Sequence, residues 1–282
     1  MWLLLTLLAT VCFAIARVVQ KSLLNGAKHD PITYAIFFQL SVALFTLPIA
    51  LANGFAFPPL AQVWPFLLVT ILLYCLANIF SYYSLKKIPV SDFTILTATI
   101  PIWATITAVL FLHESANPAK LLGVMLTIVG IIIAFYNGKT FVLTKAHCAA
   151  LLAAVCLGCA FTNDGYLLQR FSATTYSFLF WFLPGLVLGI IYYRKLSGIT
   201  VFVKDSFISL LIPSFLFAIA SFATNVSYQL GGESSQIATI TQSSVILTII
   251  FSMIFLGERT NIARKLVAGI IVVIGVILVQ II

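Results

Sequence analysis

Charge is what this sequence has least of. Asp, Glu, Lys and Arg make up 8% of its 282 residues, and hydrophobic residues make up 62%. A soluble domain carries about 25% charged residues. No charged residue at all occurs between Pro31 and Leu85. Such a chain cannot cover itself with a surface that water tolerates, which excludes a soluble globular protein.

Motifs for metal, redox and nucleotide chemistry are missing as well. Of the five cysteines, only Cys156 and Cys159 form a close pair, and they have no histidine or further cysteine beside them. The sequence contains no Walker-type loop, no HExxH and no GxSxG. We therefore expect no metal, no cofactor and no enzymatic activity. The net charge of +8 is spread thinly between apolar segments, a pattern that does not indicate nucleic-acid binding.

What the sequence does contain is a series of long apolar segments. A helix needs roughly 20 mainly apolar residues to cross about 30 Å of hydrocarbon. Charges, Pro, Gly and Asn divide the chain into ten such segments with short connections. The predicted spans are 2–24, 31–52, 63–84, 91–112, 118–137, 146–168, 174–193, 206–229, 234–256 and 262–281.

The fourth and ninth predicted spans resemble each other at a constant offset of 144 residues. The matching pairs are Ser91/Ser235, Thr97/Thr241, Ile102/Ile246, Ile106/Ile250, Phe111/Phe255, Leu112/Leu256, Glu114/Glu258 and Asn117/Asn261. The chain thus divides into halves 1–137 and 146–282, joined by a loop at 138–145. Because each half has an odd number of spans, the second enters the membrane from the opposite side. The sequence predicts an all-α membrane protein with ten transmembrane helices built from two inverted five-helix repeats, the plan of secondary transporters.

The basic residues are distributed unevenly between the loops. Twelve Lys and Arg residues lie in or near the loops that follow the first, third, fifth, seventh and ninth spans. The other side has only Lys120 and Arg170, and Arg17 lies within the first span. Positively charged loops face the cytoplasm, so this bias predicts that both termini are extracytoplasmic.

The ends of the two halves carry a resemblance to a known family. They read FLHESANPAKLLGVMLTIVGIII and FLGERTNIARKLVAGIIVVIGVIL, each with Leu-x-Glu, a short polar turn and a last span with small residues. In this the chain resembles EamA-type members of the drug/metabolite transporter superfamily, over essentially its whole length. The resemblance implies alternating-access transport of a small metabolite, often an amino acid or related solute, commonly outward. This family is usually drawn with cytoplasmic termini, opposite to the prediction from the loop charges.

We therefore predict a secondary transporter, an exporter or exchanger, in the bacterial cytoplasmic (inner) membrane. Its partners are a small-molecule solute and the lipid bilayer, with no nucleic acid, and we expect a monomer or weak homodimer. The alternatives are an intramembrane enzyme that modifies a lipid or metabolite, and a membrane scaffold that transports nothing.

Polar side chains within the spans are the candidates for contact with the solute, because in hydrocarbon they must find partners. The predicted solute-binding residues are Asn78, Tyr82, Asp92, Thr99, Trp103, Asn225, Tyr228, Gln236, Thr239, Gln242 and Ser243. The alternative is that Ser and Thr bond their own helix and that the aromatic rings pack or lie at the membrane interface. Pro101 predicts either a hinge in the fourth span or a simple packing bend.

Charges inside or at the ends of spans form a separate group. Arg17, Asp92 and Asp164 are candidates for ion coupling or for recognition of solute charge, the alternative being that they snorkel to the nearest interface. Glu114 and Glu258 end their spans where the helix dipole disfavours a carboxylate. Asn117 and Asn261, three residues later, are predicted to cap the next helices. We interpret these four residues as structural turns in which each Glu bonds the start of the following helix, or pairs with Lys120 in the first turn and with Arg264 or Lys265 in the second.

Overall fold

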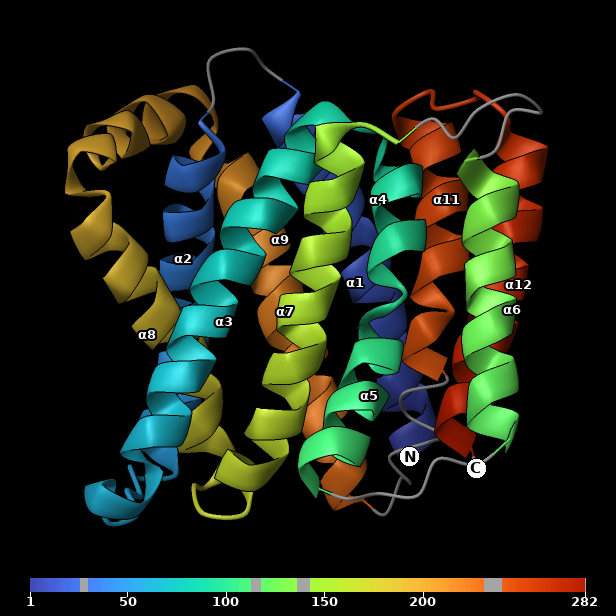
Figure 1. Ribbon diagram of the computed structural model, residues 1–282. Coiled ribbons are helices and arrows are strands. Elements are labelled where there is room, and N and C mark those ends of the chain that lie inside the picture. Colours follow the sequence, from blue (N-terminus) through green and yellow to red (C-terminus); the bar gives the residue numbers. More distant parts are fainter. Residues whose placement is uncertain (26–29, 113–117, 136–142, 231–239, 282) are drawn as a thin grey trace.

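The computed structural model describes residues 1–25, 30–112, 118–135, 143–230 and 240–281. The regular structure of these residues is entirely helical, and the helices form one bundle with both chain ends at the same end of it (Figure 1). The helices are α1 (Trp2–Leu24), α2 (Pro31–Ala52), α3 (Leu60–Lys87), α4 (Val90–Thr97), α5 (Ile100–Leu112), α6 (Pro118–Phe135), α7 (Lys145–Leu168), α8 (Ala173–Ile191), the 3₁₀ turn η1 (Tyr193–Lys195), α9 (Ser197–Gln229), α11 (Ser244–Phe255) and α12 (Ile262–Ile281).

The surface of the bundle suits lipid. Within the described ranges, seven helices are long and apolar enough to cross a membrane, and two shorter apolar helices cover Leu121–Phe135 and Ile240–Phe255. Large apolar side chains such as Leu110 and Met125 point outward, each 64% exposed. The all-α prediction is confirmed for the described part of the chain, while the count of ten spans remains a prediction.

Helix ends follow local sequence signals. Asp30 precedes Pro31 and accepts hydrogen bonds from the backbone N–H groups of Ile32 (3.1 Å) and Thr33 (3.0 Å), which caps α2. The same carboxylate lies 2.9 Å from Nζ of Lys195 in η1. Partial burial raises the pKa of Asp30, but the hydrogen bonds from Lys195 and Thr33 outweigh it and hold this pKa below its ordinary value.

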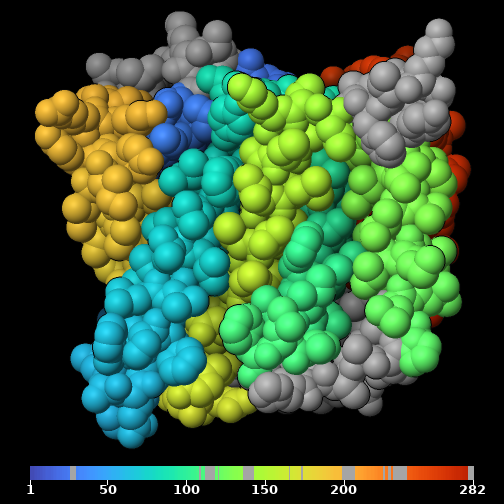
Figure 2. Space-filling model, in the orientation of Figure 1, coloured from blue at the N-terminus to red at the C-terminus, as the bar shows by residue number. Residues whose placement is uncertain are grey.

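Helices from the two halves of the chain pack in a reciprocal pattern. The first helix of the first half, α1, lies along α9, the third span of the second half. Conversely, α7 begins the second half and lies along α3, as Figure 1 shows. The pairs α2–α8, α4–α11 and α6–α12 join equivalent spans, and α3, α7 and α5 follow one another across one face (Figure 2). Exchanging the halves therefore reproduces the same set of neighbours.

Glycines allow the close approach of α6 and α12. A Cβ atom on Gly130 would lie 2.6 Å from Val272 Cγ2 and 3.0 Å from the carbonyl oxygen of Ala268. A Cβ atom on Gly275 would lie 2.7 Å from the carbonyl oxygen of Gly123. Small residues at such crossings let helix backbones meet, which favours association within a membrane.

Candidate functional site: two interrupted spans between the halves

The fourth and ninth predicted spans are both interrupted, at equivalent positions. In the fourth, α4 ends at Thr97 and α5 begins at Ile100, with Thr99 in the turn between them. In the ninth, Ser243 separates helical residues 240–242 from α11. Thr99 and Ser243 correspond at the offset of 144 residues found in the sequence. The sequence predicted a hinge or a packing bend at Pro101 in the fourth span and none in the ninth, so the turn at Ser243 is the feature that it missed.

The two breaks have the same hydrogen bonds. The Thr99 hydroxyl donates to the carbonyl of Leu96 (2.8 Å), and the Ser243 hydroxyl donates to the carbonyl of Ile240 (2.6 Å). The backbone N–H of each residue reaches the same carbonyl, at 3.2 and 3.0 Å. Bonds to the carbonyl three residues back, typical of a 3₁₀ turn, thus interrupt the α-helical pattern at both positions.

A proline is therefore not what the two breaks share. Pro101 follows the first break, whereas the second has the buried Val245 at the matching position. Interrupted helices are where secondary transporters form their solute sites, because the freed backbone groups must line a cavity. We take the region around Thr99 and Ser243 as the candidate site.

The other predicted solute-binding residues are dispersed around these breaks. Gln242 is half-buried and adjoins Ser243. Trp103, in the first turn of α5, has a buried indole N–H without a hydrogen-bond partner among the described residues. Asn78 donates to the carbonyl of Tyr74 in its own helix, at 2.7 Å. Four candidates lie outside the described part: Gln236 and Thr239 entirely, and Asn225 and Tyr228 with their side chains.

Tyr82 belongs to an aromatic cluster that joins both halves. Its ring centroid lies 4.9 Å from that of Tyr34 and 5.8 Å from that of Phe38. Phe38 in turn contacts Phe217 of α9, at 5.1 Å. The Tyr82 hydroxyl accepts a hydrogen bond from the amide of Gln20, at 3.2 Å. The cluster is buried, so these rings form the interior of the bundle and not an interfacial belt.

Asp92 lies in a buried ion pair with the second half. Its carboxylate is 2.7 Å from Nζ of Lys265 in α12 and 3.7 Å from Nε2 of His147 in α7. Lys265 also donates to the Ser91 hydroxyl, at 3.0 Å. A buried carboxylate is tolerated where a cation compensates it. In this conformation Asp92 therefore joins three helices, and its predicted role in solute binding remains untested.

Glu258 has partners other than those expected from the sequence. We expected it to bond the start of the following helix, but its carboxylate accepts from the N–H groups of Val90 (2.9 Å) and Ser91 (3.3 Å) and from the Ser91 hydroxyl (2.9 Å). It thus caps α4 of the other half, where the free N–H groups and the positive end of the helix dipole favour an anion. Its counterparts Glu114 and Asn117 lie outside the described residues.

Asn261 lies immediately before α12, and its predicted side-chain cap stays a prediction. Its carbonyl accepts the first main-chain hydrogen bond of α12, from Lys265 at 3.0 Å, and its φ of 54° is left-handed. Asn tolerates that region better than most residues do. The turn that carries Glu258 is therefore set by Gly257, also at a positive φ, and Asn261.

Asp164 is held by hydroxyl groups and not by a cation. It accepts from Tyr74 (2.6 Å), Tyr176 (2.5 Å) and, more weakly, Thr70 (3.4 Å), and it is 8% exposed. No Lys, Arg or His among the described side chains pairs with it. The cluster joins α3, α7 and α8. Asp164 was singled out in the sequence, but its partners were missed, although the polar stripe Thr70, Tyr74 and Asn78 follows helical spacing.

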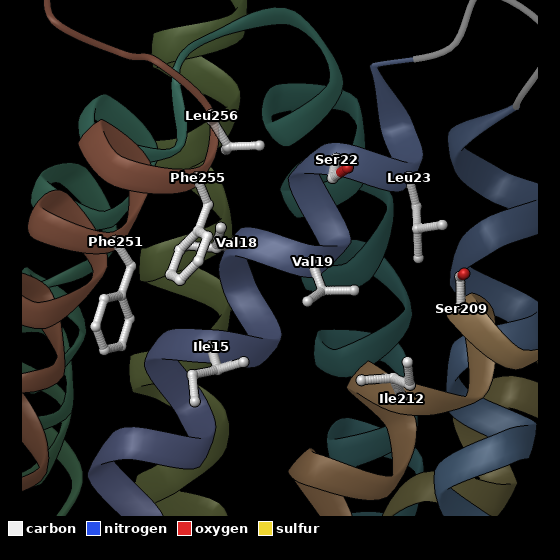
Figure 3. Close-up of a pocket in the computed structure, with 10 residues that line it drawn as sticks. All are labelled: Ile15, Val18, Val19, Ser22, Leu23, Ser209, Ile212, Phe251, Phe255 and Leu256. Atoms are coloured by element: carbon white, nitrogen blue, oxygen red, sulfur yellow. The ribbon is translucent and has the colours of Figure 1, made fainter.

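A hollow with a different character lies elsewhere in the bundle. It measures about 580 Å³ and lies between α1, α9 and α11 (Figure 3). Its lining is Ile15, Val18, Val19, Ser22, Leu23, Ser209, Ile212, Phe251, Phe255 and Leu256. Apart from the two serines these side chains are apolar, and Phe255 is 70% exposed. None of the predicted solute-binding residues lines this groove. Among the described residues, no group of three or more His, Cys, Asp and Glu could hold a metal ion.

Comparison with known protein families identifies one that matches this chain. The sequence model of the EamA-like transporter family matches this chain twice, over residues 1–136 and 144–281. Among curated proteins, none matches. A solved structure described only as "Crystal structure of protein" is similar with a TM-score of 0.58 and 14% identity. The match covers 96% of this chain and 97% of that one, and at this identity it supports the fold alone.

Proposed function

Because the chain belongs to the EamA-like transporter family, we propose that it is a secondary transporter that moves a small polar metabolite by alternating access. Membership makes it an integral membrane protein and a transporter of the drug/metabolite superfamily. The finer proposal, an exporter or exchanger of an amino acid or related solute, has one principal support. Thr99 and Ser243 interrupt equivalent spans of the two halves with the same hydrogen bonds, as expected for a solute site between inverted repeats.

The proposed repeats are 1–137 and 146–282. Their reciprocal packing, α1 with α9 and α7 with α3, supports this division. In alternating access one end of the path closes while the other opens, so contacts between the halves must form and break. The Glu258–Ser91 and Lys265–Asp92 contacts join the halves at one end of the bundle. We assign them to the closed gate of this conformation.

The proposed orientation follows from the charged ends of the helices. Lys21, Lys87, Lys145, Lys195 and Lys265 belong to helix ends at the end of the bundle opposite the two chain termini (Figure 1). The positive-inside rule makes that end cytoplasmic. The gate formed by Glu258 and Ser91 is then on the cytoplasmic side of the bacterial inner membrane.

We also propose that the functional unit is a monomer or weak homodimer.

Counterflow in proteoliposomes tests the function. Purified protein is reconstituted with an unlabelled metabolite mixture inside, and labelled amino acids, organic acids and amines are offered outside. We expect at least one labelled solute to accumulate transiently and to do so without ATP. An enzyme would convert a solute chemically, which chromatography of the recovered label detects. Exchange of no solute in either direction contradicts the proposal and favours a scaffold.

A further inference from the structure

Arg17 is a cation deep in the bundle. It lies seven residues before the end of α1 at Leu24, and at a rise of 1.5 Å per residue this is about 10 Å from the nearer helix end. Its guanidinium carbon is 5.3 Å from the ring centroid of Phe93 in α4 and 5.4 Å from that of Phe217 in α9. Arg17 itself is half-buried, whereas Phe93 and Phe217 are buried.

No described carboxylate compensates this charge. The ion pairs among the described side chains involve Asp30 and Asp92, and neither includes Arg17. Asp164 is held by tyrosines, and Glu258 caps α4. A charge within a span is costly, and such residues normally have a partner. The two aromatic faces provide part of the compensation, and the five N–H donors of the guanidinium still lack a described acceptor.

The side chains around Arg17 indicate which kind of ligand it could bind. Phe38, whose ring contacts Phe217 at 5.1 Å, also contacts Tyr34 and Tyr82, at 6.2 and 5.8 Å between ring centroids. The rings of Phe38, Trp181 and Phe217 are in mutual contact at 5.1–6.1 Å. The planar guanidinium can donate two parallel hydrogen bonds to a carboxylate. The aromatic rings can pack against the apolar part of the same ligand. Among the described residues, the carboxylates that could pair with an ammonium group, Asp30, Asp92, Asp164 and Glu258, are all engaged elsewhere.

We propose that Arg17 binds the anionic group of the transported solute, and that the solute is a monocarboxylate with an apolar or aromatic body. This inference rests on the proposed transport function and narrows it, since it selects organic acids over free amino acids and amines. The aromatic rings beside Arg17 then hold the solute body, between α1 of the first half and α9 of the second.

Ligand-induced shifts in melting temperature of the purified protein, followed by tryptophan fluorescence, test the charge preference. The probes are matched triplets with one body and three head groups: phenylacetate, phenethylamine and 2-phenylethanol, and hexanoate, hexylamine and 1-hexanol. We expect the carboxylates alone to stabilise the wild-type protein. Equal stabilisation by the amines or alcohols, or stabilisation by neither carboxylate, overturns the inference without any variant.

Variants then test the residue. Arg17→Gln is expected to weaken carboxylate affinity at least tenfold, about 1.4 kcal/mol, and Arg17→Lys to recover part of it. Arg170→Gln is the matched control, because Arg170 also stacks on a ring, Tyr166 at 3.6 Å, but at an exposed helix end. Retained carboxylate affinity in Arg17→Gln overturns the inference.

The counterflow assay separates this inference from the transport function. Exchange of amines or alcohols but not of carboxylates overturns the inference and still supports transport. Exchange of no solute refutes the transport function itself.

Discussion

Glu258 binds Ser91 twice, accepting from its backbone N–H at 3.3 Å and from its hydroxyl at 2.9 Å, across 167 residues of sequence. The same hydroxyl accepts from Lys265, at 3.0 Å. The turn between α11 and α12 is thus fastened to the first turn of α4. A carboxylate at a helix C-terminus is unfavourable without partners. Here Glu258 accepts hydrogen bonds from backbone N–H groups at the start of α4, which have no partner within their own helix.

Glu258→Ala removes this cap and leaves buried donors unsatisfied, so we expect a loss of about 1–3 kcal/mol in the free energy of unfolding. Glu258→Gln keeps an acceptor oxygen and should lose less. Denaturation in detergent measures both variants. Arg259→Ala is the control, because Arg259 is the exposed neighbour of Glu258. Equal stability of Glu258→Ala and wild type would show that the cap is not needed.

The Asp164 cluster makes a second prediction. Tyr74→Phe and Tyr176→Phe each remove a short hydrogen bond to a buried carboxylate, and each should lower the free energy of unfolding by about 1.5–3 kcal/mol. The double variant should differ from the sum of the single ones, because both hydroxyls serve one carboxylate. Tyr193→Phe is the control, since Tyr193 is 61% exposed. Losses no larger than that of Tyr193→Phe would contradict the assignment.

The α6–α12 contact makes a third prediction. Gly275→Ala would place a Cβ atom 2.7 Å from a backbone oxygen of α6. Overpacking of this kind costs about 1–3 kcal/mol, and Gly130→Ala should behave similarly. Gly189→Ala is the matched control in α8, where the nearest atom to a new Cβ is 3.8 Å away. Melting temperatures that fall in the control as much as in Gly275→Ala would argue against close packing.

Asp30 makes a prediction about pH. A carboxyl group whose pKa is lowered by folding contributes stability at pH above its unfolded pKa, and loses it as pH falls through the folded pKa. Asp30→Asn keeps the capping oxygen but loses the charge paired with Lys195. We expect a small stability deficit at pH 7, because the side chains of the pair are 40% and 41% exposed and solvent screens them. This deficit should vanish as the pH falls below the ordinary value of 3.8. A deficit that does not depend on pH would rule out the ion pair as its source.

Much of the fold could be predicted from the sequence, because hydrocarbon leaves few options. A run of apolar residues between Asp30 and Asn53 must satisfy its own backbone and is therefore helical, and α2 occupies Pro31–Ala52. The break at Ser243 was less accessible. Its polar neighbours Thr241 and Gln242 favoured a cavity wall, but Ser and Thr also occur in intact helices, where they bond the backbone three or four residues back.

Long-range partners were the part that the sequence could not supply. Glu258 and Asn261 indicated a structural turn before α12. The hydrogen-bond donors to Glu258 are nevertheless in α4, because tertiary packing and not sequence proximity decides which helix start lies nearest. Arg17 was recognisable by its charge alone. Its position between Phe93 and Phe217 depends on how α4 and α9 pack against α1, and no spacing rule predicts that.

Solvent access to the interrupted spans tests the central claim most directly. Gln242→Cys and Thr99→Cys are made after replacing the five native cysteines, with Ile254→Cys, on the 60% exposed outer face of α11, as the control. A membrane-impermeant methanethiosulfonate reagent is applied to protein in proteoliposomes of both orientations. We predict that the reagent modifies Gln242→Cys and Thr99→Cys but not Ile254→Cys, and that a solute active in counterflow slows the modification. Inert cysteines at both interior positions would contradict a solute path between the two breaks.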